Sequence, residues 1–257
     1  MQLLIRDILA ARQAEGKPAV SFELFPPKTE AGERDLLEKT LPELIKLRPD
    51  YCSVTYGAGG GTQDKTLRIV EHIIRRHDVP TLAHLTCVNA TRAQILTVVG
   101  QLRALGVANI LALRGDPTGN QGEFVRPEGG FEYAHQLVSL LRELGGLSVG
   151  VAGFPEGHPA CKAGRQADWN YLKDKIGCGA DFVLTQLFFD NRHFFAMRDH
   201  LQRQGVQTPL IPGIIPILSA NQIKKFTALC GAELPAPLLA DLERLGEDEQ
   251  AAAQYGI

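Results

Sequence analysis

The sequence predicts an α/β fold, a (β/α)8 TIM-type barrel of which seven strands are evident in this chain. Short apolar segments alternate with longer amphipathic segments along all 257 residues. The short segments are apolar on both faces, as are the strands of a parallel sheet covered by helices. Polar residues follow the ends of six of them. A barrel gathers all those ends on one face, whereas a doubly wound sheet concentrates its site at one switch point. We therefore expect one barrel domain spanning 1–257.

The strand candidates follow one another in a regular order. They are VSFELF (20–25), YCSVTYG (51–57), TLAHLTC (81–87), NILALRGD (109–116), SVGVAGFP (148–155), FVLTQLFF (182–189) and PLIPGIIP (209–216). The segments between them place apolar residues three and four apart, which predicts helices packed by one face. The clearest are ERDLLEKTLPELIKL (33–47), TLRIVEHIIRRH (66–77), RAQILTVVGQLRALG (92–106) and YAHQLVSLLRELG (133–145).

The amino-terminal segment and the composition narrow the class of partner. MQLLIRDILAARQAEGK (1–17) is an amphipathic helix pattern interrupted by Arg6 and Asp7, unlike a signal peptide or a membrane span. The net charge is −2, with no long run of like charge, so we expect a small-molecule substrate and neither nucleic acid nor membrane. The five cysteines are widely spaced and lack CxxC pairing, which is typical of reduced cytoplasmic thiols. We also expect a homo-oligomer.

Glycine-rich segments follow two of the strands. AGGGTQDK (58–65) and PTGNQGEFVRPEGG (117–130) fall where a barrel carries its chemistry. The second is long enough to form a mobile flap, although an insertion without a role is the alternative.

Glu23 is a carboxylate inside the otherwise apolar SFELFPPK (21–28). Among Phe22, Leu24 and Phe25 its pKa would rise, and a carboxyl group that stays protonated near neutral pH can act as a general acid. The two prolines that follow stiffen the chain and would hold the acid in place. Two alternatives remain, a carboxylate paired with Arg114 or one pointing into solvent.

Two further strand ends carry candidate residues. In LALRGDP (111–117), Gly115 allows close backbone approach to a ligand between Arg114 and Asp116, and a structural ion pair of the two charged residues is the alternative. In TQLFFD (185–190), Gln186 needs hydrogen-bond partners, which a heterocyclic ligand or the neighbouring backbone could supply.

The segment ADWNYLKDK (167–175) predicts a helix whose Asp168 and Lys175 could bind a ribose hydroxyl and a phosphate, or form a solvated face. These two residues, with His84 and His158, could also serve as metal ligands or bases. However, no HExxH motif or closely spaced histidine pair is present, and we expect no metal. The GxSxG, GxxxxGK[ST] and GxGxxG motifs are absent too, which argues against a serine hydrolase, a P-loop enzyme and a Rossmann fold.

Eight short motifs occur in order between Ser21 and Phe226: FELFPPK, SVTYGAGGGT, HLTC, LALRGDP, PEGHP, the AD..YLK.K helix, TQLFFD and PGIIPI. Together they resemble methylenetetrahydrofolate reductase, an FAD-dependent folate enzyme. The resemblance implies a barrel that reduces 5,10-methylenetetrahydrofolate to 5-methyltetrahydrofolate with NADH or NADPH. The hydride would pass through FAD in a ping-pong sequence.

The resemblance also assigns roles to residues of this sequence. Glu23 would be the general acid that helps to open the imidazolidine ring of the substrate, and Asp116 would tune the flavin and aid substrate binding. Substrate contacts would come from Glu23, Asp116, Gln186, Gln222 and Phe226. The positions that match the FAD-binding residues are Thr55, His84, Arg114, Gly115, Asp116, Tyr133, Ala134, Ala152, His158, Asp168 and Lys175.

The sequence departs from the family pattern in two places. Tyr171 stands where relatives often have Asn in the flavin-binding helix. After the acidic helix LLADLERLGEDEQ (238–250), the chain shows no eighth strand. An open barrel exposes strand edges, so the chain would be a fragment, or a partner subunit or the amino-terminal helix would close it. Two other functions therefore stay open: a non-catalytic flavin- or folate-binding homologue, and another flavin-dependent barrel oxidoreductase such as proline dehydrogenase.

Overall fold

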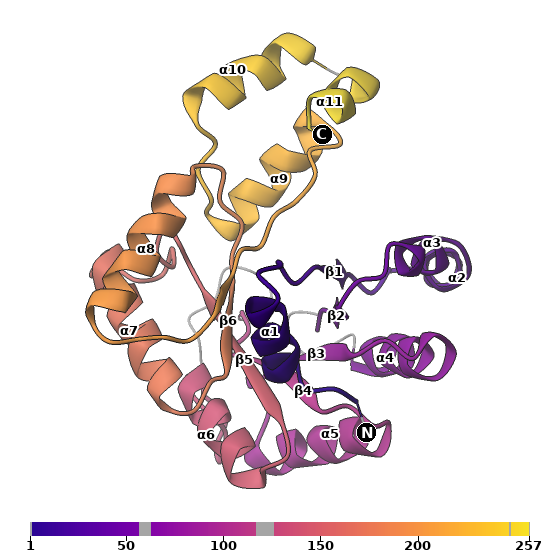
Figure 1. Ribbon diagram of the computed structural model, residues 1–257, viewed down its shortest axis with the longest axis vertical. Coiled ribbons are helices and arrows are strands. Elements are labelled where there is room, and N and C mark those ends of the chain that lie inside the picture. Colours follow the sequence, from indigo (N-terminus) through magenta and orange to yellow (C-terminus); the bar gives the residue numbers. More distant parts are fainter. Residues whose placement is uncertain (1, 57–62, 117–125, 247, 257) are drawn as a thin grey trace. The chain divides into compact units, whose positions relative to one another are not determined.

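The computed structural model describes residues 2–56, 63–116, 126–246 and 248–256 (Figure 1). The predictions on the glycine-rich segments at 58–65 and 117–130 fall largely outside these residues, and the flap stays a prediction.

Seven strands form one sheet, hydrogen-bonded in the order of the chain. They are β1 (Ser21–Leu24), β2 (Tyr51–Val54), β3 (Thr81–Thr86), β4 (Asn109–Leu113), β5 (Ser148–Gly153), β6 (Phe182–Thr185) and β7 (Leu210–Ile211). The paired strands are parallel, which confirms the predicted α/β class. The fold is that of a TIM-type barrel without an eighth strand in the part of the chain that the structure describes.

Helices lie between the strands, as the spacing of apolar residues predicts. They are α1 (Ile5–Ala14), α2 (Glu30–Asp35), η1 (Leu36–Thr40), α3 (Leu41–Lys46), α4 (Gln63–His77), α5 (Arg92–Ala104), α6 (Ala134–Leu144), α7 (Arg165–Gly177), α8 (Asn191–Arg203), α9 (Ala220–Cys230), α10 (Ala236–Leu245) and α11 (Glu249–Tyr255). Among the helices for which the structure gives every residue, none is long and apolar enough to cross a membrane.

Two predicted helices are interrupted, each for a local reason. The segment 33–47 contains a π-helical turn, η1, in which the amide of Leu41 donates to the carbonyl of Leu36. Pro42 follows directly, and a proline has no amide hydrogen to continue the α-helical pattern. The acidic segment 238–250 divides into α10 and α11 at Gly246, whose φ of 59° and ψ of −129° end the first helix.

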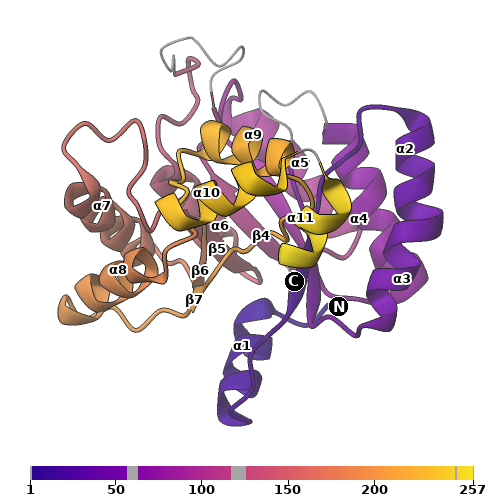
Figure 2. The ribbon, with the colours of Figure 1, turned by 90° about the horizontal axis from the view of Figure 1, so that it is seen from above.

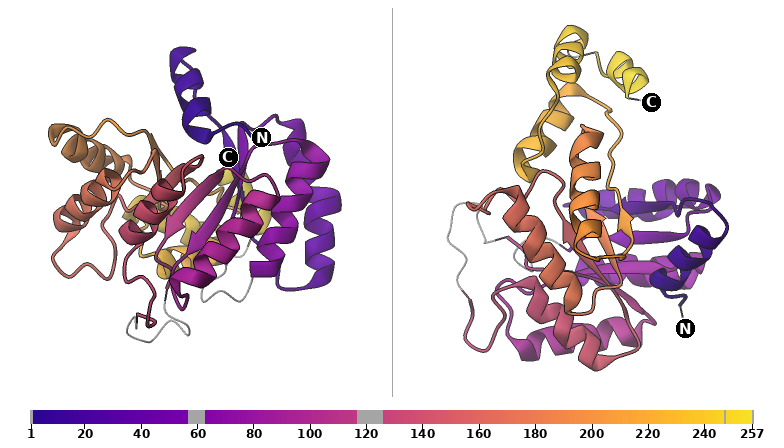
Figure 3. Two further views of the ribbon diagram at one scale, coloured as in Figure 1. Left: turned by 90° about the horizontal axis from the view of Figure 1, so that it is seen from below. Right: turned by 60° about the vertical axis from the view of Figure 1, so that its left-hand side comes forward.

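The chain divides into two compact units. The first contains residues 1–151 and 178–181, and the second contains 152–177 and 182–257. In the first unit α4 packs on β2 and β3 beside α2 and α3 (Figure 2). In the second unit α7 and α8 lie side by side (Figure 3). Ile217, Ala220, Ile223 and Leu242 form a separate apolar cluster there.

Helix α1 is attached to the ends at which β4 and β5 begin. The side-chain oxygen of Asn109 accepts a hydrogen bond from the amide of Ile5 at 2.8 Å, and the Ser148 hydroxyl accepts one from the amide of Arg6 at 3.2 Å. These bonds satisfy two of the amides that an α-helix leaves unpaired at its first turn.

Candidate active site

In the first unit, Glu23 shares one face of the sheet with Ser53. The two residues are paired across β1 and β2, and side chains alternate between the faces of a strand. Phe22 therefore points to the other face, while Phe25 lies beyond the strand and is 56% exposed. The expectation that Phe22 lies beside the carboxyl group was wrong, because adjacent residues of a strand point to opposite faces.

His84 is the group that approaches Glu23. Its Nε2 lies 3.7 Å from Oε2 of Glu23 and 2.7 Å from the Ser53 hydroxyl. The imidazole is buried, with 7% of its side chain exposed, and burial lowers its pKa to about 3. His84 is therefore uncharged at neutral pH, so its contact with Glu23 is not an ion pair.

The Glu23 carboxyl group has a raised pKa, as the sequence predicts. Desolvation by the surrounding protein raises it to about 6, and no cation among the described residues lowers it again. The side chain is nevertheless 37% exposed, so the carboxyl group reaches solvent and is not enclosed in the core. A carboxyl group of this kind exchanges protons with water and is partly protonated near neutral pH, as a general acid must be.

The end of β4 holds Arg114, Gly115 and Asp116. Gly115 has a φ of +84°, and a Cβ placed there would lie 2.5 Å from Cγ1 of Val88. Only glycine fits this combination of backbone angle and close approach. Arg114 is partly buried, and Asp116 is exposed at the last described position before residue 117.

The remaining predicted residues of the first unit lie just after β2 and at the start of α6. Thr55 donates its amide to the carbonyl of Leu24 at 3.0 Å, which holds the end of β2 against β1. Tyr133 precedes α6, is 49% exposed and stacks on His135 with the ring centroids 5.7 Å apart. Ala134 is buried as the first residue of that helix.

In the second unit, Lys175 reaches the end of β5. Its ammonium group donates to the carbonyl of Ala152 at 2.6 Å. Burial lowers the lysine pKa to about 8, against the opposing effect of the Asp168 charge. Burial is also the main cause of a raised pKa for Asp168, which His158 and Lys175 partly offset. The two residues lie seven apart on α7, on one face of the helix. The two side chains that were predicted to bind a ribose hydroxyl and a phosphate are thus desolvated, and they do not form a solvated face.

His158 and Gln186 follow β5 and β6. The His158 ring packs edge-on against Phe154, with 4.5 Å between centroids, and its Nδ1 accepts from the amide of Ala160 at 3.1 Å. The side-chain oxygen of Gln186 accepts from the amide of Leu187 at 2.8 Å. The neighbouring backbone therefore satisfies the acceptor of this amide, which was one of the two readings that the sequence left open.

Gln222 and Phe226 lie four residues apart on α9, so they share one face of that helix. Both are partly buried. Ser219 caps the helix, because its hydroxyl accepts from the amide of Gln222 at 3.1 Å. The cap fixes the point at which the helix begins, and with it the position of Gln222.

Sequence reasoning missed two polar groups of the first unit. Ser53 binds His84, and its position two residues before Thr55 was the available signal, since residues two apart in a strand share a face. Thr86 ends β3, and its hydroxyl is buried without a hydrogen-bond partner among the residues that the structure describes. Such a hydroxyl suits a polar atom of a bound ligand.

The fold and these residues define a class: an α/β barrel-type protein in which β1 carries a carboxylic acid, β3 a neutral histidine and α7 a desolvated lysine. Solved structures share the fold at low identity. A protein from Aquifex aeolicus VF5 has a TM-score of 0.54 at 12% identity, with 98% of each chain covered. A crystal structure of 2,3-dimethylmalate lyase has a TM-score of 0.52 at 12% identity, with 96% of this chain and 80% of the other covered.

The sequence comparisons give the family. The methylenetetrahydrofolate reductase family model matches residues 7–257, and the chain belongs to this family. It is 39% identical to methylenetetrahydrofolate reductase (NADH) 1 of Arabidopsis thaliana over 98% of this chain, but it spans only 44% of that relative. It is 36% identical to 5,10-methylenetetrahydrofolate reductase of Escherichia coli (strain K12), with 98% of this chain and 83% of the relative covered.

Proposed function

We propose that this chain reduces 5,10-methylenetetrahydrofolate to 5-methyltetrahydrofolate, with NADH or NADPH as hydride donor and FAD as bound cofactor. Family membership supports the reaction. The single observation that carries the proposal is the Glu23 carboxyl group, whose pKa of about 6 suits a general acid. The relatives named for NADH favour that donor.

Glu23 supplies the proton in this proposal. Opening of the five-membered ring of the substrate leaves an amine that must be protonated, and a carboxylic acid can donate to that nitrogen. The neighbouring His84 is uncharged and hydrogen-bonded to Ser53, so it adds no positive charge that would lower the pKa of Glu23. The pair keeps the acid protonated more often than an ordinary glutamate.

Each unit offers groups that suit one part of a flavin dinucleotide. When bound, FAD accepts hydride from the nicotinamide and delivers it to the folate. In the first unit, the unpartnered Thr86 hydroxyl and the backbone at Gly115 suit a polar ring. In the second unit, Lys175 and Asp168 suit a phosphate and a ribose hydroxyl. Donor and acceptor would use the site in turn, which is a ping-pong sequence.

The experiment separates the two half-reactions. Protein loaded with FAD is reduced with NADH in a stopped-flow spectrometer without oxygen, and the reduced protein is then mixed with 5,10-methylenetetrahydrofolate. We expect both steps in the wild type. Glu23→Gln should slow the folate step by about 10²–10⁴-fold, the usual contribution of a general acid, and leave the NADH step nearly unchanged.

Glu43→Gln is the matched control, because Glu43 lies on α3 in an exposed pair with Lys46. It should leave both steps unchanged. Loss of both steps in Glu23→Gln would show that Glu23 has a different role. A wild-type protein that binds FAD and is reduced by NADH, but is not reoxidised by the folate, would contradict the proposed substrate.

A further inference from the structure

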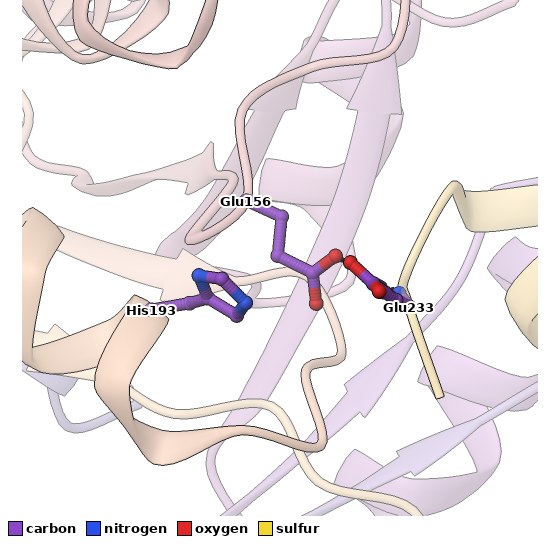
Figure 4. Close-up of side chains that lie close together, drawn as sticks. All are labelled: Glu156, His193 and Glu233. Carbon is purple, nitrogen blue, oxygen red and sulfur yellow. Dashed lines mark hydrogen bonds between the residues drawn. The ribbon is translucent and has the colours of Figure 1, made fainter. Parts of the chain in front are cut away.

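We propose that Glu156, His193 and Glu233 bind one divalent transition-metal ion, for which Zn²⁺ is the best match. All three residues belong to the second unit (Figure 4). Each offers one ligand atom, and these atoms lie within 4.8 Å of one another. The site does not depend on the proposed reductase activity.

Three separate segments bring these residues together. Glu156 lies in the turn after β5, His193 in the first turn of α8, and Glu233 between α9 and α10. The last segment is fixed at Gly231, whose φ is +74° and where a Cβ would lie 2.4 Å from Cγ of Pro159. This close approach holds the loop that carries Glu233 against the loop that carries Glu156.

The Glu156 carboxylate is the observation that points to a ligand. Its Oε2 accepts a hydrogen bond from the amide of Glu233 at 2.9 Å, which fixes the orientation of the group. Its Oε1 is buried and has no hydrogen-bond partner among the described residues. A buried oxygen without a partner is unfavourable, and a bound cation would satisfy it.

The donor set selects the kind of metal. Figure 4 shows a ring nitrogen of His193 facing the Glu156 carboxylate. One imidazole with two carboxylates suits Zn²⁺, whereas Mg²⁺ and Ca²⁺ prefer oxygen ligands alone. Bond lengths of about 2.0–2.2 Å place tetrahedral donors about 3.3–3.6 Å apart. The ligand atoms, which lie within 4.8 Å of one another, would therefore need to approach one another by up to about 1.5 Å, and the adjoining cavity has room for a water as fourth ligand.

Two arginines lie near the site, with different consequences. Arg192 is neutralised by Asp190, whose carboxylate accepts from its Nε at 2.8 Å. Nη1 of Arg165 lies 3.4 Å from Nδ1 of His193. A guanidinium can only donate, so it favours the imidazole proton on the other nitrogen, which is the one a metal would need. Arg165 should therefore weaken metal binding through both its charge and this contact.

The test is a competition titration of the purified protein with Zn²⁺ against a chromophoric chelator. We expect the wild type to bind one Zn²⁺ at this site. Glu156→Gln keeps the acceptor for the Glu233 amide, and it should weaken binding by at least about tenfold, as should His193→Gln. Arg165→Gln should strengthen binding. The control variants Glu249→Gln and His72→Gln, at residues outside the three-residue cluster, should match the wild type.

X-ray absorption at the zinc edge identifies the ligands independently. The account predicts only nitrogen and oxygen neighbours, at about 2.0–2.2 Å. Sulfur neighbours at about 2.3 Å would place the metal on cysteines and overturn the proposal. Equal Zn²⁺ affinity of the wild type, Glu156→Gln and His193→Gln would overturn it as well.

Discussion

At the residue scale, burial alone shifts Glu23 and His84 in opposite directions. Removing water disfavours the charged form of any group, so it raises the pKa of a carboxylic acid and lowers that of an imidazole. Glu23 rises to about 6 and His84 falls to about 3. Between these values both side chains are mainly uncharged. Two neutral groups 3.7 Å apart need no counter-ion, which leaves the acid available to a substrate.

Lys175 provides a test of the cofactor assignment. We predict that Lys175→Met weakens FAD binding, because it removes a charge-assisted contact worth about 1.5–3 kcal/mol, or about 10- to 150-fold in Kd. Lys173→Met, at an exposed position on the same helix, is the control and should bind as the wild type does. Fluorescence titration with FAD measures both.

The pH dependence of FAD binding provides a second test of the assignment of Lys175 to the phosphate site. A lysine with a pKa of about 8 is charged below that pH and neutral above it. FAD affinity should therefore fall as the pH rises through 8 in the wild type. In Lys175→Met this part of the pH dependence should vanish. An unchanged profile in the variant would remove Lys175 from the phosphate site.

At the element scale, the turn after β4 depends on Gly115. We predict that Gly115→Ala is strongly destabilising, because it combines a left-handed backbone with a Cβ 2.5 Å from Val88. The backbone strain costs about 1–2 kcal/mol, and relief of the overlap adds about 1–3 kcal/mol. Gly106→Ala is the matched control, since its φ is +89° but its Cβ would meet nothing within 4 Å. Urea unfolding should show a smaller loss in the free energy of unfolding for Gly106→Ala than for Gly115→Ala. Equal losses would mean that the contact with Val88 does not matter.

Asn109 controls the attachment of α1. Its side chain accepts from the amide of Ile5 at 2.8 Å and donates to the carbonyl of Leu3 at 3.1 Å. We predict that Asn109→Ala lowers the free energy of unfolding by about 1–3 kcal/mol, because these groups lose their partner. Amide hydrogen exchange should quicken specifically in α1. Asn191→Ala, at an exposed position, should change neither quantity, and slow exchange in Asn109→Ala would show that other contacts hold the helix.

The strands and helices were predictable from the sequence where the pattern of apolar residues is long and regular. All seven strand candidates are strands, but most end earlier than their apolar runs. β1 ends at Leu24, before Pro26 and Pro27, and β7 ends at Ile211 before Pro212. Prolines cannot donate hydrogen bonds to a neighbouring strand, so these two strand ends could have been predicted from the sequence. The π-helical turn was not, since apolar spacing does not distinguish it from the flanking α-helix.

At the scale of the whole molecule, the candidate residues were chosen from the sequence because they are polar and lie at or just after the ends of predicted strands. Which side chains face one another was harder to predict, because it depends on register. Glu23 and Ser53 become neighbours only through the pairing of β1 with β2. The cluster of Glu156, His193 and Glu233 was beyond prediction, since its members are far apart in the chain and form no motif. The single-domain prediction for 1–257 remains a prediction.

The rate of the folate step as a function of pH tests the central claim most directly. Reduced wild-type protein is mixed with 5,10-methylenetetrahydrofolate between pH 5 and pH 8, and flavin reoxidation is followed. Since Glu23 donates only in its protonated form and has a pKa of about 6, the rate should be level at low pH. Above pH 6 it should fall by about tenfold per pH unit. The NADH step should not show this fall. A folate step that stays level across the range, or that keeps the same fall in Glu23→Gln, would contradict the account.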